Sequence, residues 1–372
     1  MKEKEKLFNR VLNSIEERKK RLSEGLENCI PWGLPRFEEV LPGIEQGKYY
    51  LITANSKVGK TQITDDLFVI NVIEQIIDNK LNIKVKMFYF SLEMTKEEKM
   101  LSLFSTILYR KENIRLSPTD LRSTNRNKPI PNEVLELIRK YQEYFDKIEE
   151  IIEFIDDIRN GYGMFNLVRG FMEDNGTMHY KNLEIEGKSI KVRDYYEPHD
   201  PDLYVFTIID HIGLIATETR DGKKLNLFDS ISILSSDYLI RLRNVYKVIP
   251  VVVQQQASSQ ESVENKKANK LKPSLDGLGD NKTTQRDANV ILGLFSPMRH
   301  ELREYHKYDI TKFRDHIRFL EILGGREGGA GTISPLYFDG AVNFFAELPD
   351  PSDNANMNQV YKLINKINES NT

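Results

Sequence analysis

An apolar run, a short loop that ends in Gly-Lys-Thr and an amphipathic segment follow one another over residues 48–79, and this order most constrains the fold. The run KYYLITA at 48–54 predicts a buried strand, and apolar side chains recur at the helical period after the loop. A second predicted strand, VKMFYFS at 85–91, precedes Thr95 and Glu98, which predict a capping box opening another helix. This alternation predicts an α/β fold with a mostly parallel central sheet flanked by helices.

Two later apolar runs end in polar side chains. DLYVFTIID at 202–210 ends in an aspartate, and KVIPVVVQQQ at 247–256 ends in glutamines. Open α/β sheets bind ligands at the carboxyl ends of their strands, so both endings are candidate site positions. Further strands are predicted at 289–295 and 317–323, and Asp339-Gly340 between two apolar runs predicts a β-hairpin near the C-terminus.

Changes in composition divide the chain into segments. The first segment is highly charged, but its apolar residues fall at helical spacing and predict one amphipathic helix. A further amphipathic helix is predicted from Pro131 to about Lys147. The predicted segments are an amphipathic helix at 1–29, one α/β domain at 30–348 with an inserted hairpin at 177–198 and a mobile loop region at 257–287, and a polar tail at 349–372 that frays.

Composition excludes several classes of protein. The 40% hydrophobic content excludes a disordered chain, and 53 basic against 56 acidic residues leave a net charge of −3, so any polyanion site must be local. The single cysteine excludes a disulfide framework and fits a reducing compartment, and the histidines show no metal-ligand spacing. The apolar runs are shorter than the roughly 18 residues of a membrane span, so we expect a soluble, intracellular protein without membrane contact.

The loop ANSKVGKT at 54–61 has the parts of a phosphate-binding loop. Small residues let backbone N–H groups surround phosphate oxygens, Lys60 supplies a neutralising charge, and Thr61 supplies a hydroxyl for magnesium. The strict pattern has glycine where this chain has Ala54, and a chance Gly-Lys-Thr in a surface turn is the alternative. We expect ATP and Mg²⁺ as ligands, with nucleotide contacts from Ser56, Lys57, Val58, Gly59, Lys60, Thr61 and Gln62.

Three polar positions after the predicted strands complete a candidate hydrolytic site. Asp210 would hold magnesium together with Thr61, and Glu93 would activate the attacking water. Gln255 or Gln256 would report the γ-phosphate to the following loop. The alternatives are a strand-capping aspartate, a solvated glutamate at a helix start and solvated glutamines.

Two basic features are candidates for contacts beyond the nucleotide. Arg326, in the glycine-rich stretch GGREGGAGT, would project outward as an arginine finger, although a surface arginine in a turn is commoner. Four lysines and no acidic residue occur over 265–275, with Lys282 and Arg286 further on. A basic loop can follow a phosphate backbone without reading bases, and a solvated charge run is the alternative.

Taken in order, these blocks resemble the C-terminal ATPase domain of DnaB-type replicative helicases, members of the RecA-like class. The resemblance spans about residues 30–346 and is most specific in FYFSLEMT at 88–95, whose glutamate is the family's catalytic base. FTIIDHIGLI at 206–215 resembles the block that holds the family's magnesium aspartate. By resemblance the catalytic residues are therefore Glu93, Lys60, Arg326 and, counting from Pro250, the sensor Gln256.

The resemblance also extends to the family's DNA-binding loop, within residues 272–292. Gly279 replaces a family arginine, which leaves Asn281, Lys282 and Lys272 as the expected DNA contacts. Gly324 stands where the family has a lysine, which would supply the second charge acting in trans. We expect no counterpart of the family's N-terminal domain, because the residues before position 30 are too few to form it. The predicted helix at 1–29 resembles the linker helix that packs on an adjacent subunit. Packing of this helix on its own domain is the alternative.

The resemblance implies a ring-shaped, hexameric 5′–3′ DNA helicase of phage or mobile-element type, working in the cytoplasm of a bacterial host cell. Its implied partners are single-stranded DNA, further copies of the chain, and primase or loader proteins. Two other functions stay open: a RecA-like ATPase that switches assembly or partner binding without unwinding, and a nucleotide-dependent ring scaffold. The reduced charge in the DNA loop and the expected lack of the N-terminal domain favour the switch.

Overall fold

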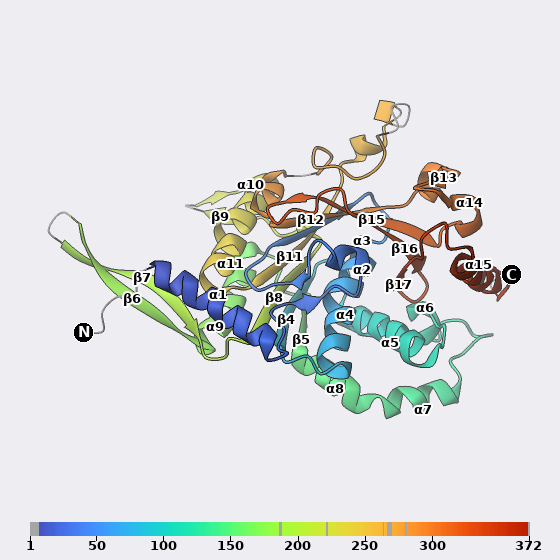
Figure 1. Ribbon diagram of the computed structural model, residues 1–372, viewed down its shortest axis with the longest axis horizontal. Helices are drawn as coiled ribbons and strands as arrows, with labels where there is room; N and C mark the ends of the chain where they lie inside the picture. The colour runs from blue at the N-terminus through green and yellow to red at the C-terminus, as the bar shows by residue number, and fades with distance from the viewer. Residues whose placement is uncertain are drawn as a thin grey trace.

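A nine-stranded sheet organises the part of the chain that the computed structural model describes, residues 7–185, 188–220, 222–262, 264–265, 270–279 and 281–370 (Figure 1). Six strands are parallel to their neighbours and three are added antiparallel at one edge. This arrangement confirms the predicted α/β fold and mostly parallel sheet. The spatial order is β17 (Phe344–Glu347), β16 (Ile333–Asp339), β15 (Ile317–Gly325), β12 (Val290–Phe295), β3 (Tyr50–Ala54), β11 (Ile249–Gln255), β8 (Leu203–Asp210), β4 (Lys84–Ser91) and β5 (Ile152–Ile155).

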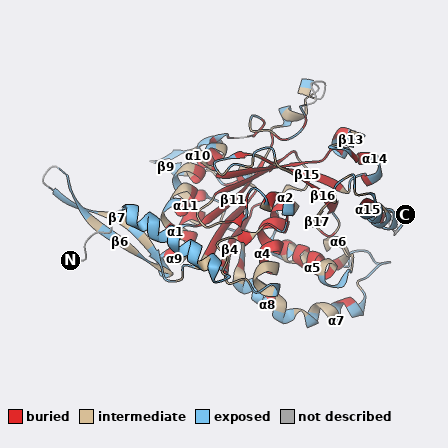
Figure 2. Cartoon of the chain, in the orientation of Figure 1, coloured by how far each residue is buried: buried red, intermediate tan, exposed pale blue. Residues whose placement is uncertain are grey.

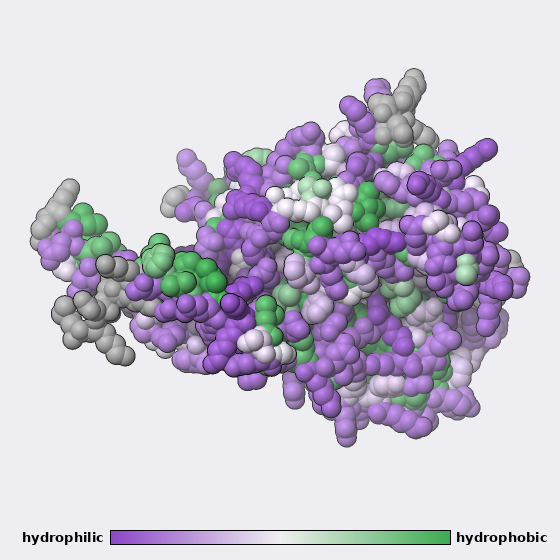
Figure 3. Space-filling model, viewed as in Figure 1, coloured by the Kyte–Doolittle hydropathy of each residue, from purple (hydrophilic) through white to green (hydrophobic). Residues whose placement is uncertain are grey.

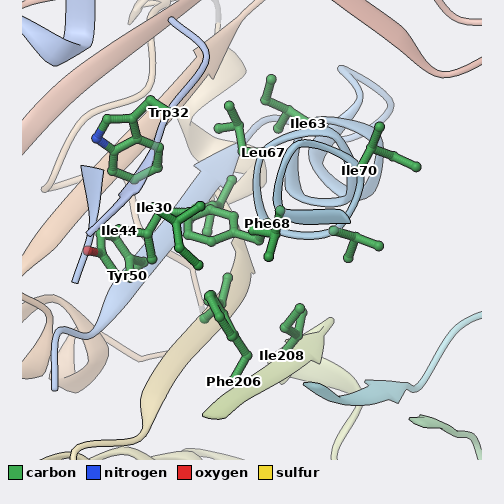
Figure 4. Packing of buried hydrophobic residues seen from close by; sticks show 14 of the residues in the cluster. Ile30, Trp32, Ile44, Tyr50, Ile63, Leu67, Phe68, Ile70, Phe206 and Ile208 are labelled. Carbon is green, nitrogen blue, oxygen red and sulfur yellow. The ribbon is translucent and has the colours of Figure 1, made fainter. Parts of the chain in front are cut away.

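Both faces of the sheet are buried, which explains the continuous apolar runs of its central strands. Successive residues of β3 alternate between the faces, so that Tyr50 packs in one core and Leu51 in the other. In the first core, Trp32 meets Tyr50 and Phe68 edge to face, with ring centroids 5.6 and 5.7 Å away (Figure 4). The buried residues form a continuous layer along the centre of the molecule (Figure 2).

Helices cover the two faces of the sheet. The first face carries a long helix that begins as α3 (Lys60–Asp65), contains π-type turns and α4 (Asn71–Ile73) and ends at Asp78, together with α5 and α8. The second face carries α9 and the helix formed by α10 and α11. These helices are α5 (Lys96–Glu112), α8 (Gln142–Ile151), α9 (Gly161–Asp174), α10 (Leu227–Ser232) and α11 (Ile240–Tyr246).

The predicted helix at 131–147 is two helices in the structure. Tyr141, with φ −84° and ψ 5°, separates α7 (Asn132–Lys140) from α8. Tyr141 and Tyr144 pack against the first core, so tertiary packing overrides the continuous helical pattern. The remaining short elements are α2 (Pro35–Glu38), α6 (Pro118–Leu121), α13 (Thr283–Asp287), α14 (Ile310–Phe313), β1 (Ile30–Pro31), β2 (Gly43–Ile44), β9 (Thr219–Arg220), β10 (Lys223–Lys224), β13 (Glu304–Tyr305) and β14 (Tyr308–Asp309).

The C-terminal residues differ from the prediction of a fraying tail. After the hairpin of β16 and β17, the chain forms α15 (Asn354–Ser370). Met357, Ile364 and Ile367 of this helix are buried against Phe313 and other residues of a third core. The described polar residues of α15 are exposed, and their number makes the short apolar stripe difficult to recognise in the sequence.

Two elements extend from the main body on the same side (Figure 1). Residues of the predicted insertion form a long antiparallel ribbon, β6 (Gly176–Ile185) and β7 (Lys188–Pro198). The second element is α1 (Leu7–Ser23), of which no described residue is buried. Its apolar side chains reach the surface and contribute to an apolar patch at this end of the molecule (Figure 3).

The region 257–287, predicted to be a mobile loop, contains helical turns and buried residues. It contains a short helical turn at Ser258–Glu261 and α13, and Leu271 and Leu278 are buried. Lys266 and Lys267 of the predicted basic run lie outside the described residues. Across the described ranges, no helix combines the length and the apolar character needed to cross a bilayer.

Candidate active site

A cleft of about 730 Å³ opens at the carboxyl end of the parallel strands. Lys60 and Thr61 reach it from the start of α3, Glu93 from the loop after β4, Asp210 from the end of β8 and Gln255 from the end of β11. These residues are far apart in the sequence, but the parallel register brings the strand ends together: Ser91 of β4 pairs with Asp210, and Gln255 pairs with Ala54. The cleft therefore lies where an open α/β sheet binds its ligands.

The loop between β3 and α3 has the backbone of a phosphate cradle. Lys57 and Gly59 have φ values of 58° and 109°, and the latter conformation is strained for any residue with a side chain. The loop leads directly into the long helix at 60–78, whose first N–H groups have no acceptor inside the helix. Of the residues predicted to contact the nucleotide, Ser56, Lys57, Gly59 and Gln62 line the cleft, whereas the side chain of Val58 is buried in the core.

Lys60 lies over this loop. Its Nζ donates to the Asn55 carbonyl at 3.3 Å and to Gln255 Oε1 at 3.4 Å. Partial burial lowers the pKa of Lys60, and the nearby carboxylates of Asp210 and Glu93 oppose this shift. The acceptors that the ammonium contacts are neutral oxygens, so an added polyanionic group would bind it favourably.

Thr61 and Asp210 meet at the base of the cleft. Thr61 Oγ1 donates to Asp210 Oδ1 at 3.0 Å, and Asp210 is only 2% exposed. Hydroxyl and carboxylate oxygens are the ligands that Mg²⁺ prefers, and Mg²⁺ commonly uses few protein ligands together with phosphate oxygens. The donor set at this position therefore fits the predicted magnesium ion.

Glu93 is exposed and lines the same cleft from the loop that follows β4. The capping box of Thr95 and Glu98 fixes the start of α5 two residues later, with Glu98 N donating to Thr95 Oγ1 at 3.2 Å. A carboxylate held on a short, anchored loop at the cleft edge is suitably placed to accept a proton from a water molecule.

The prediction of Gln256 as the sensor does not hold, because its side chain points away from the cleft. Gln256 is 3% exposed, and its Nε2 donates to Thr53 Oγ1 at 3.0 Å and to the Ser274 carbonyl at 3.1 Å. Its neighbour Gln255 lines the cleft and accepts from Lys60. Alternation along β11 places only one of the two glutamines on the cleft side, and counting from Pro250 selected the other.

Two buried cations beside the cleft were not predicted. Arg318 of β15 donates from Nε to the carbonyl of Val58 at 2.8 Å and so supports the phosphate loop. Lys99 of α5 is 2% exposed, and its Nζ lies 2.9 Å from Asp65 Oδ2. The available signal for Lys99 was its place on the stripe of Leu103 and Ile107, which otherwise faces the core.

Arg326 is exposed at the end of β15, and its Nη2 donates to the carbonyl of Arg286 at 2.8 Å. The adjoining Gly325 pairs with Val290, which pairs with Tyr50 at the first residue of β3. The phosphate loop follows the last residue of β3, so Arg326 lies at the opposite edge of the sheet, roughly 15 Å away by strand rise. Arg326 therefore does not belong to the cleft of its own chain.

The three predicted DNA contacts differ in availability. The prediction of Asn281 as a DNA contact is wrong, because this residue is 2% exposed. Its amide donates to the Phe228 carbonyl and to Ser232 Oγ. Lys282 keeps an exposed side chain and lies 3.8 Å from Asp276. Lys272 binds both carboxylate oxygens of Glu321, at 2.9 and 3.0 Å.

Comparisons with known proteins agree with this architecture. The family described as DnaB-like helicase C terminal domain matches residues 29–347. One solved ATPase domain superposes with a TM-score of 0.65 at 17% identity, covering 93% of this chain and all of that one. A DnaB-like replicative helicase, solved in a study of its interactions with primase, superposes with a TM-score of 0.64 at 17% identity, covering 93% of this chain and 69% of that one.

A search of curated sequences gives no significant match. The two structural likenesses establish the RecA-like fold, and the family match covers most of the sequence, including the phosphate loop and the segment after β15. Since this match spans well over half of the residues, the chain belongs to the DnaB-like helicase C-terminal domain family.

Proposed function

We propose that this protein is a ring-forming replicative DNA helicase, which hydrolyses ATP at the interface between two copies and uses it to translocate on single-stranded DNA. The proposal is carried by one observation: Arg326 lies at the edge of the sheet opposite the cleft that holds Lys60 and Glu93. One chain supplies two halves of a phosphoryl-transfer site that cannot meet within it. A head-to-tail contact between copies would join them, and such contacts close into rings. A ring of six and 5′–3′ polarity are proposed from the family resemblance.

The proposed roles follow the positions of the side chains. Lys60 and the loop amides bind the phosphates of ATP, and Glu93 accepts a proton from the attacking water. Thr61 and Asp210 hold Mg²⁺, which supplies charge neutralisation at the phosphates when it is bound. Gln255, beside Lys60, connects the phosphate site to the chain after β11, and Arg326 of a neighbouring copy stabilises the transferred phosphoryl group.

The helix α1 supports assembly through a second contact. Its apolar residues form one stripe, and their side chains are 40–73% exposed, so the helix does not bury this face on its own domain. Its C-terminal part is tied to the body through ion pairs such as Arg18 with Glu45 at 2.8 Å and Arg21 with Asp202 at 2.7 Å. We propose that the neighbouring subunit covers the stripe, which consists of Leu7, Phe8, Val11, Leu12 and Ile15.

The test combines assembly with two activities. The mass in solution is measured with and without ATP and single-stranded DNA, and the same sample is assayed for DNA-stimulated hydrolysis and for unwinding of a forked duplex. The helicase proposal requires a ring, stimulation by DNA and ATP-dependent unwinding. ATP hydrolysis at a rate that DNA does not change, in a sample that does not unwind the fork, would contradict the helicase proposal.

A second candidate function is an ATPase switch that controls assembly without unwinding. It is favoured by the low availability of the side chains predicted to contact DNA. Asn281 is buried, and Lys272 and Lys282 each have an acidic neighbour. Six such loops in a ring would give a weaker field for a phosphate backbone than free lysines would. ATP-dependent capture of a primase or loader protein, with no unwinding, would support the switch. Either function is proposed for the cytoplasm of a bacterial host cell.

A further inference from the structure

The two carboxylate oxygens of Asp210 have separate partners. Oδ1 accepts from Thr61, at the position proposed for magnesium. Oδ2 lies 3.3 Å from the hydroxyl of Tyr89 and 3.5 Å from the ammonium of Lys99. Asp210 and Lys99 are each 2% exposed, so water contributes little to holding this carboxylate, and its orientation depends on these protein groups.

Lys99 belongs to a network of charged groups in which Asp65 also lines the cleft. Its Nζ lies 2.9 and 3.2 Å from the two oxygens of Asp65 and 2.5 Å from Tyr89 Oη, while Tyr89 donates to Asp65 Oδ1 at 2.7 Å. The three N–H groups of the ammonium can thus all be used, on Asp65, Tyr89 and Asp210. Because Lys99 and Asp65 cancel in charge, the network leaves the negative charge of Asp210 available to the cleft.

We propose that Lys99 is a positioning residue for the magnesium ligand Asp210, an inference that rests on the function proposed above. It holds Oδ2 so that Oδ1 faces Thr61. Lys99 also lies in the first turns of α5, the helix that begins just after Glu93. The same ammonium therefore connects the loop that carries the proposed base to the strand that carries the metal ligand. Mutation of a residue that orients a metal ligand typically lowers metal affinity by roughly 10–100-fold.

The test uses a charge-balanced double variant, Asp65→Asn with Lys99→Met. Removing Lys99 alone would leave two buried carboxylates without a cation, and the chain could then fail to fold for that reason. The double variant removes one charge of each sign, so the net charge of the network is unchanged while the contact between Lys99 and Asp210 is lost. Tyr89→Phe is the second variant and deletes a single hydroxyl. Lys96→Met, an exposed lysine of the same helix, is the matched control.

The measurement is the affinity for a fluorescent ADP analogue at increasing Mg²⁺ concentration and in EDTA, with thermal unfolding recorded for each variant. In the double variant we expect the Mg²⁺ concentration for half-maximal effect to rise by about tenfold or more, with affinity in EDTA unchanged. Tyr89→Phe should move the midpoint in the same direction, and Lys96→Met should not move it. A merely structural role would lower the unfolding temperature without moving the midpoint.

Two negative results are distinguishable. If the wild-type chain responds to Mg²⁺ and the folded double variant and Tyr89→Phe respond at the same concentration, the positioning role of Lys99 is overturned while the proposed magnesium site stands. If the nucleotide affinity of the wild-type chain does not depend on the Mg²⁺ concentration, the assignment of Thr61 and Asp210 as magnesium ligands is wrong. The proposed role of Lys99 is then overturned as well.

Discussion

Glu93 reaches the cleft as a carboxylate on a short loop, and its proposed task depends on its charge rather than its size. Glu93→Gln keeps the shape and removes the proton acceptor, so nucleotide binding should persist while turnover falls by about 10²–10⁴-fold. Equilibrium binding of a fluorescent nucleotide and steady-state phosphate release measure the two effects separately. Glu97→Gln, at an exposed position of the adjoining helix α5, is the control. Turnover that survives in Glu93→Gln would mean that another group activates the water.

Substitutions of the two adjacent glutamines at the end of β11 should have different effects, one on hydrolysis and the other on stability. Gln255→Ala removes a side chain that lines the cleft and should reduce hydrolysis with little change in unfolding temperature. Gln256→Ala leaves Thr53 and Ser274 without their buried partner and should cost about 1–3 kcal/mol of stability. Hydrolysis rates and chemical denaturation of both variants measure this contrast. The opposite pattern would restore Gln256 as the sensor.

These residues show what the sequence could predict of the site. The positions of Lys60, Thr61, Glu93 and Asp210 at one cleft were predictable because each lies at or after the end of an apolar strand, and parallel strands end at one edge of the sheet. The choice between Gln255 and Gln256 was not predictable, because it depends on which side of the strand each residue faces just before the chain turns. Asn281 and Lys99 were mispredicted or missed because burial of a polar group depends on partners that are distant in sequence, such as Phe228 and Asp65.

At the scale of elements, α15 shows a similar limit. Its sequence is polar enough to predict a fraying tail, whereas three apolar residues on one face dock it onto the third core. Ile364→Ala should therefore lower the free energy of unfolding by about 2–5 kcal/mol. Leu363→Ala, at a 40% exposed position of the same helix, should change it by about 0.5 kcal/mol or less. Denaturant unfolding measures both, and equal small effects would mean that α15 does not dock in solution.

The larger elements were more predictable than their junctions. The strands of the parallel sheet and the hairpin of β16 and β17 follow from apolar runs and turn residues, because these signals are local. The break at Tyr141 and the docking of α15 depend on contacts with other parts of the chain, which no local pattern encodes. The apolar stripe of α1 is likewise visible in the sequence, whereas the surface that we propose covers it is not.

At the scale of the whole molecule, the role proposed for Arg326 would make activity a property of neighbouring copies. Arg326→Ala chains keep a complete cleft but fail to complete the cleft of their neighbour, and loss of an arginine finger costs about 10³–10⁵-fold in turnover. When variant and wild-type chains are mixed in equal amounts and exchange freely into rings of six, only about 2% of the rings contain no variant. If subunits fire in sequence, unwinding of a forked duplex should fall far below half of the wild-type rate.

A mixture with Lys96→Met is the control, because Lys96 is an exposed lysine of α5 that belongs to neither half of the site. Unwinding by that mixture should stay near the wild-type rate, whereas unwinding by the Arg326→Ala mixture should follow the proportion of intact rings. Unwinding by the Arg326→Ala mixture in simple proportion to its wild-type chains would mean that Arg326 does not act on a neighbour. The separation of Arg326 from Lys60 by the length of β3 would then be a feature of the fold without a role in hydrolysis.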